Sequence, residues 1–258
     1  TAEVAMVEIT VRGAGITGLM CAWVVAQRGA IVQVVDPHGV AAGASGGIVG
    51  ALAPHVPENW NPKKAMQFAA LDQAKAMWAE VARIGGVDPG YARTGRIQPL
   101  VDQAGVDLAR QRAETATDLW QGKYAWRVIP ASEAGIVVES ATGLLIHDTL
   151  TALIHPRQAC AALAAALAAT NVPIVTEAPT RGTEVWATGA TDLQEISRAL
   201  GKSIGAPIKG QAALLGCDLR GAPQVFADGL HIVPHMDGTV AIGSTTEREF
   251  DDAYSTDA

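Results

Sequence analysis

The chain has 258 residues, 49% of them hydrophobic, and is therefore long enough to bury a full core in one or two domains. Its formal net charge of −7 disfavours non-specific binding to nucleic acid or to an anionic membrane surface. No apolar run reaches the length of about 18 residues that a membrane-spanning helix requires. Three cysteines without metal or disulfide spacing, at positions 21, 160 and 217, are expected to be buried, reduced thiols of a cytoplasmic protein.

Residues 7–36 follow the pattern of a strand, a helix and a second strand. Apolar and polar residues alternate at positions 7–11, and a helical apolar period runs from Ile16 to about Arg28. Residues 31–35 form a short apolar run that ends at Asp36. Between the first strand and the helix lies GAGITG at residues 13–18, which has the G-x-G-x-x-G spacing. An acidic residue about 20 positions beyond such a motif is typical of a dinucleotide-binding unit.

The residue types in this unit suit that ligand. The first glycine permits a tight turn, the second lets the backbone approach a pyrophosphate, and the third lets the helix pack close to the strand. Free N–H groups and the positive end of the helix dipole favour phosphate at the helix start. Asp36 can accept a hydrogen bond from a ribose hydroxyl. The sequence therefore predicts a dinucleotide site, without distinguishing NAD from FAD, at Gly13, Gly15, Ile16, Thr17, Gly18 and Asp36.

The rest of the chain mixes helices and strands. We expect helices at 63–82, 106–120 and 156–167, and strands at 96–101, 127–129, 143–147, 173–176, 184–187, 209–216, 230–234 and 239–243. The last three strands are predicted to be antiparallel, with a hairpin turn at residues 237–238. The fold class is therefore α/β, or α+β over the whole chain. A dinucleotide-binding domain of residues 1–82 plus 150–204 is interrupted by a second, mixed or antiparallel domain of residues 83–149 plus 205–258.

Four stretches in this order resemble the FAD-dependent D-amino-acid oxidase superfamily, and its glycine oxidase-like members most closely. They are GAGITG with Asp36, GASGGIVGALAP at 43–54, ATG at 187–189, and KGQAALL at 209–215 followed by LHIVPHMDGTVAIGSTTE at 230–247. The resemblance implies a Rossmann-type FAD-binding domain interrupted by a substrate domain. It also implies oxidation of the C–N bond of a small amino acid or secondary amine, such as glycine, sarcosine or a D-amino acid. A hydride would pass to flavin N5, and molecular oxygen would be the acceptor and give hydrogen peroxide.

The resemblance also implies the cofactor contacts. Loop residues after the second strand would lie along the flavin and the pyrophosphate, namely Ala44, Ser45, Gly46, Gly47 and Val49. Thr188 and Gly189 would close over FAD, and Pro37 and His38 would lie by the adenosine.

Three histidines are the candidate catalytic residues. Relatives carry a tyrosine before the IVP motif and an arginine after it, whereas this chain has His231 and His235, which we expect to share one strand face. His55 follows the flavin loop and is placed to touch the flavin or the substrate. The alternative for each histidine is a solvated or structural role, and no metal is expected because further ligands are missing. Arg96 is more simply a surface arginine than a ligand for a substrate carboxylate, and Ser45 lacks the context of a hydrolase nucleophile.

Other functions remain open at this stage. Members of the superfamily continue with a segment that supplies a carboxylate-binding arginine, and this chain ends before it, so the sequence predicts a chain without its C-terminal part. The alternatives are a catalytically incomplete flavin-binding fragment or subunit, and the FAD domain of a tRNA-modifying oxidoreductase. The acidic balance argues against direct RNA binding, and the GASGG loop argues against an NAD-linked dehydrogenase. The expected partners are a small amine and oxygen, and a homo-oligomer stays possible.

Overall fold

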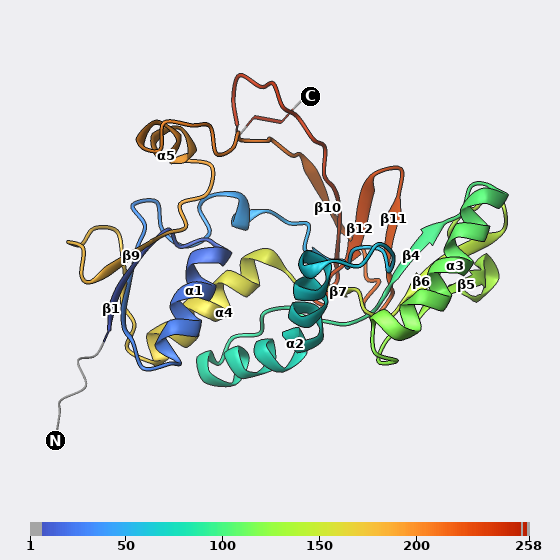
Figure 1. The fold of residues 1–258 in the computed structure, drawn as a ribbon, viewed down its shortest axis with the longest axis horizontal. Helices are drawn as coiled ribbons and strands as arrows, with labels where there is room; N and C mark the ends of the chain where they lie inside the picture. Colours follow the sequence, from blue (N-terminus) through green and yellow to red (C-terminus); the bar gives the residue numbers. More distant parts are fainter. Residues whose placement is uncertain (1–6, 254, 257–258) are drawn as a thin grey trace.

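The computed structural model describes residues 7–253 and 255–256. The molecule is an α/β protein with two main sheets, and Figure 1 shows the smaller sheet at the left and the larger one at the right, with helices between them. The α/β class predicted from the sequence is therefore confirmed.

The smaller sheet is parallel and has the strand order β8-β2-β1-β9. Its strands are β1 (Glu8–Arg12), β2 (Ile31–Val35), β8 (Ile174–Val175) and β9 (Thr183–Trp186). Val11 of β1 pairs with Val34 of β2, and both side chains are fully buried. A strand buried on both faces needs an apolar run, which explains the composition of residues 31–35.

Three helices pack beside this sheet and form its hydrophobic core. They are α1 (Ile16–Ala26), α2 (Pro62–Gly85) and α4 (Pro156–Ala169). The side chain of Asn61 accepts a hydrogen bond from the Lys64 N–H and caps α2, and Gly86 ends that helix in a left-handed conformation. Leu163 and Leu167 of α4 are fully buried in this core. The small alanines around them allow α4 to lie close to both neighbouring helices.

The larger sheet has seven strands in the order β10-β13-β12-β11-β4-β6-β5. Their bounds are β4 (Arg96–Pro99), β5 (Trp126–Pro130), β6 (Leu144–Asp148), β10 (Ala212–Gly216), β11 (Gln224–Ala227), β12 (Leu230–Pro234) and β13 (Thr239–Gly243). Helix α3 (Gln103–Leu119) packs at the β5 end, where Trp120 and Trp126 meet edge to face. The predicted hairpin lies between β12 and β13.

The three last predicted strands, β10, β12 and β13, are antiparallel as expected, but one other pairing in this sheet was not predicted. β11 pairs with β4 in parallel, while every other neighbouring pair among the described strands of this sheet is antiparallel. Strands β4, β5 and β6 come from the middle of the chain, and β10 to β13 come from its last part, so this parallel pair joins two separate segments. Alternation along a strand specifies its faces but not the direction of its neighbour.

The sequence analysis also missed some short elements and predicted the burial of two cysteines wrongly. Strands β3 (Ala51–Leu52), β7 (Ala152–Leu153) and β11, and helix α5 (Leu193–Ala199), were not predicted, because each is too short to show a clear period. Cys160 is buried as expected, but Cys217 is exposed and Cys21 is only partly buried. Among the described residues, none of the helices combines the length and the apolar character needed to cross a bilayer.

Candidate functional site

The glycine-rich turn after β1 is closely packed. Gly13 has a φ of +107°, and a Cβ there would lie 2.3 Å from the carbonyl oxygen of Ala187. A Cβ on Gly18 would lie 1.9 Å from the carbonyl oxygen of Gly13. The turn therefore requires glycine at both positions, and it lies directly against the segment that follows β9. Between them Ile16 begins α1 and Thr17 is exposed at the first turn of that helix.

Asp36 fixes the end of β2 against this turn. Its Oδ2 accepts a hydrogen bond from the Ala14 N–H at 2.7 Å, and its Oδ1 accepts one from the His38 N–H at 2.9 Å. Each carboxylate oxygen retains acceptor capacity for a hydroxyl group. Pro37 and His38 are exposed beside it.

The loop of residues 43–50 is bonded to three separate parts of the chain. Ser45 Oγ accepts from the Ile16 N–H at 2.9 Å, which places the loop at the N-terminus of α1. Arg157 Nε donates to the Gly46 carbonyl oxygen at 2.6 Å, and His235 Nε2 lies 2.8 Å from the Ile48 carbonyl oxygen. Ala44 and Gly47 are exposed on this loop. Arg157 was not predicted as a site residue, because a sequence pattern does not show which side chain meets a distant carbonyl group.

The loop also lies on the larger sheet. Val49 packs with Val233 and Ala241, which alternate onto one face of β12 and β13. A Cβ on Gly243 would lie 3.2 Å from Val49 Cγ2. The loop is thus held between the N-terminus of α1 and this face of the sheet, which we call the loop-side face.

The residues present suit a dinucleotide with a flavin. The Ile16 N–H donates to Ser45, and the next N–H groups of the first turn of α1, which have no partners within the helix, favour a phosphate. Thr188 Oγ1 is buried without a hydrogen-bond partner among the described residues, and Gly189 beside it has a φ of +66° and is exposed. A buried hydroxyl of this kind requires a ligand or water to satisfy it. The turn, Asp36, the loop and Thr188 therefore fit FAD together.

The three candidate histidines have different surroundings. His231 is half-buried on β12 with its ring 4.7 Å from that of Phe226, and its Nδ1 is buried without a partner. His235 is fully buried, with its ring 4.7 Å from that of His155. His55 is exposed, and its backbone N–H donates to Gln67 Oε1. The structure places His231 and His235 on the loop-side face at separate points, and it does not bring the three histidines together.

Arg96 corrects the prediction of a surface arginine. It is 6% exposed, and its Nε donates to Asp148 Oδ2 at 3.0 Å. Asp148 itself is fully buried. The positive charge of Arg96, after burial, is the second cause that lowers the pKa of His231, so the two side chains lie near one another.

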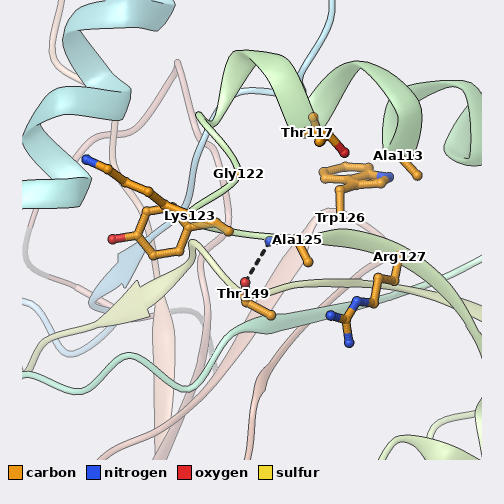
Figure 2. A pocket seen from close by; sticks show the side chains of 10 residues that line it. Ala113, Thr117, Gly122, Lys123, Ala125, Trp126, Arg127 and Thr149 are labelled. Carbon is orange, nitrogen blue, oxygen red and sulfur yellow. Dashed lines mark hydrogen bonds between the residues drawn. The ribbon is translucent and has the colours of Figure 1, made fainter.

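Two pockets lie away from the dinucleotide turn. Figure 2 shows one of 440 Å³ between α3 and β5, where the Ala125 N–H donates to Thr149 Oγ1 at 2.9 Å. None of the predicted site residues lines it. The other has a volume of 1060 Å³ and is lined by Gln98 of β4, Phe226 of β11 and the segment 137–141. Neither His231 nor Arg96 is among the residues that line it.

Three buried or half-buried histidines are expected to make the stability of the fold depend on pH. Burial is the main cause that lowers the pKa of His147, His155 and His231 below the ordinary value of 6.5. Below that value the unfolded chain binds more protons than the folded chain, so these groups stabilise the fold above pH 6.5 and lose that contribution as the pH falls. We expect the urea midpoint of unfolding to drop between about pH 7.5 and pH 5.5, above the range in which the carboxyl groups titrate.

A matched pair of variants tests this origin. His147→Gln should flatten the pH dependence of the midpoint, and His38→Gln, at an exposed position, should leave it unchanged. A midpoint that is constant over this pH range in the unaltered protein would contradict the prediction.

Comparisons with known proteins agree with this geometry. The family model described as FAD dependent oxidoreductase matches residues 8–258. Glycine oxidase from Geobacillus kaustophilus is similar in structure, with a TM-score of 0.77 and 19% identity over 96% of this chain and 74% of that one. Iminodiacetate oxidase from Chelativorans sp. BNC1 has a TM-score of 0.75 and 21% identity over 97% of this chain and 74% of its own. L-amino acid deaminase from Proteus vulgaris has a TM-score of 0.72 and 18% identity over 94% and 61%.

The glycine turn, Asp36, the loop at residues 43–50 and the buried Thr188 hydroxyl thus occur in a chain that the family model covers almost completely. The chain belongs to the D-amino-acid oxidase family of FAD-dependent oxidoreductases.

Proposed function

We propose that the protein oxidises the C–N bond of a small amino acid or secondary amine, with molecular oxygen as the acceptor. The observation that carries this proposal is the position of the loop at residues 43–50 between the N-terminus of α1 and the loop-side face with His231. A flavin held by that loop would face the sheet that carries His231, whose Nδ1 is buried without a partner among the described residues. The names of the similar solved proteins, two amine or amino-acid oxidases and an amino acid deaminase, support the same class of substrate.

The described residues have distinct tasks in this proposal. Gly15 would let the backbone approach the pyrophosphate, Gly13 and Gly18 keep the turn tight against its neighbours, and Asp36 would hold the ribose. Bound FAD supplies an acceptor for the hydride that leaves the carbon next to the amine nitrogen. The loop-side face excludes water from that carbon and orients the substrate, and His231, neutral at pH 7, offers a hydrogen bond without a charge.

We further propose the domain division that the sequence predicts. All four strands of the parallel sheet lie in residues 1–82 and 150–204, and all seven strands of the larger sheet lie in residues 83–149 and 205–258. This distribution supports a FAD-binding domain interrupted by a substrate domain.

The visible spectrum of the purified protein is the test. We expect flavin absorbance that bleaches when glycine, sarcosine or D-alanine is added without oxygen, and returns with one equivalent of hydrogen peroxide when air is admitted. Free FAD with the same amines is the control. A flavin spectrum that none of these or other small amines bleaches would reject the oxidase and favour a flavin-binding subunit. A protein that takes up no FAD would reject both.

A further inference from the structure

Two carbonyl groups of the loop at residues 43–50 are bonded to side chains of other elements. Arg157 of α4 donates to the Gly46 carbonyl oxygen, and His235 Nε2 lies 2.8 Å from the Ile48 carbonyl oxygen. Because a carbonyl oxygen can only accept, His235 Nε2 carries a proton and donates it to this bond. The Ile48 carbonyl group is therefore fixed against the end of β12, which His235 directly follows.

His235 itself has little freedom to move. It is fully buried, and its backbone N–H donates to the Thr239 carbonyl oxygen at 2.8 Å. Its ring centroid lies 4.7 Å from that of His155, whose Nδ1 accepts from the Gln158 N–H at the start of α4. The Nε2 of His155 lies 3.7 Å from Asp237 Oδ2 in the hairpin after β12. The hairpin and the start of α4 together fix the orientation of the His235 ring.

Packing alone does not account for a histidine at this position. The neighbouring side chains on the loop-side face, Val233 and Ala241, are apolar and fully buried. His235 Nδ1 is buried and has no hydrogen-bond partner among the described residues, which costs stability. An apolar side chain would avoid that cost. The hydrogen bond from Nε2 to the loop is therefore the feature that requires an imidazole here.

The same bond fixes the direction of the next N–H group in the loop. The peptide between Ile48 and Val49 is trans, so its N–H points in the direction opposite to its carbonyl oxygen. The Val49 N–H thus points away from His235. It has no acceptor within the described part of the chain, and neither do the N–H groups of Ile48 and Gly50. Backbone N–H groups that are not fully exposed are nearly always paired, so these donors indicate an acceptor from a ligand.

We propose that His235 is a positioning residue for the cofactor. By holding the Ile48 carbonyl oxygen against the larger sheet, it directs the Val49 N–H toward the oxygen and nitrogen acceptors of the flavin ring of FAD. His235 would then act through the loop and not on the substrate. This inference requires FAD, the cofactor of the family, but it does not depend on which amine is oxidised.

The test compares the binding of FAD with that of ADP, which has the adenosine and two phosphates but no flavin ring. Flavin-free protein is titrated with each ligand in a calorimeter. His235→Leu removes the donor with little change in side-chain volume. We expect it to weaken FAD binding about 2- to 10-fold, the range for one hydrogen bond, and to leave ADP binding unchanged. His235→Gln keeps an N–H donor and should bind both ligands as the unaltered protein does.

His147→Leu is the matched control, because it makes the same replacement at a partly buried histidine of β6. Both dissociation constants should stay unchanged in this variant. Urea unfolding shows whether each variant is folded, and His235→Phe, which also lacks the donor, replaces His235→Leu if the leucine variant does not fold.

Four results would overturn the proposal. They are normal FAD binding without the donor, an equal loss of FAD and ADP binding, a glutamine variant as weak as the leucine variant, and a protein that binds no FAD. A merely structural role of His235 would give the second or the third of these results.

The outcome is independent of the proposed function, since neither ligand is an amine. If FAD binding depends on the donor of His235 but no amine is oxidised, the positioning role stands and the oxidase proposal fails. If glycine or sarcosine is oxidised and His235→Leu binds FAD normally, the oxidase proposal stands and the positioning role fails.

Discussion

Replacing Gly18 with alanine is expected to destabilise the dinucleotide unit strongly. The added Cβ would lie 1.9 Å from the carbonyl oxygen of Gly13, and Val11 Cγ1 is 3.3 Å away on another side. Both neighbours belong to the buried core of the parallel sheet, where backbone atoms cannot move without disturbing β1. We expect the free energy of unfolding to fall by at least about 3 kcal/mol, the upper part of the range for overpacked cores. Urea unfolding and the stoichiometry of bound FAD measure the effect.

Gly216→Ala is the matched control. Gly216 is the last residue of β10 and is exposed. Apart from its two neighbours in the chain, no atom of the described residues lies within 4 Å of the position that a Cβ would take there. The same change of residue should therefore leave the unfolding midpoint and flavin content unchanged. A Gly18→Ala protein as stable as the Gly216→Ala protein would mean that α1 lies farther from β1 than the structure has it.

The second large effect is expected at the buried ion pair in the larger sheet. Asp148→Asn keeps the shape of the side chain and the acceptor for the Thr151 N–H, but it leaves the Arg96 charge buried without a counter-ion. Breaking one partner of a buried pair costs about 3–5 kcal/mol, because the remaining charge has lost its solvation. We expect a loss of that size in the free energy of unfolding, measured by urea titration at pH 7.5.

Glu80→Gln serves as the comparison. Glu80 pairs with Arg83 at 2.7 Å on the surface of α2, where 47% and 67% of the two side chains are exposed. Exposed pairs of this kind contribute little, because water and salt screen them. The midpoint of this variant should equal that of the unaltered protein. An equally small effect at Asp148 would show that water reaches the Arg96 guanidinium group.

The parts of the site that are local in sequence could be predicted from it. The turn at residues 13–18 and Asp36 belong to one strand-helix-strand unit, and the Ala14 N–H indeed donates to Asp36. The resemblance carried by residues 43–54 also predicted that this loop belongs to the cofactor site. In the structure the loop lies at the start of α1, where Ser45 Oγ accepts a hydrogen bond from the Ile16 N–H. These contacts follow from the motif because the elements that carry them are consecutive.

The parts that depend on strand order could not be predicted. Arg96 meets Asp148 only because β4 and β6 are neighbours in a particular register. Alternation shows that Arg96 and Gln98 share a face, but it does not show whether solvent or a second layer covers that face. The bond between Arg157 and the Gly46 carbonyl oxygen likewise depends on the placement of α4. Composition and period carry no information about such distant pairs.

The parallel pair β4–β11 has a consequence for synthesis of the protein. Arg96 and Ile97 leave the ribosome long before Gln224 and Val225, which complete their hydrogen bonds. A sheet of β4, β6 and β5 alone would present β4 as an open edge, and such edges pair readily with other chains. Completion of the seven-stranded sheet must wait for the last part of the chain, and contacts so distant in sequence form slowly. The seam between β4 and β11 can therefore form only after residues 224 and 225 have been synthesised.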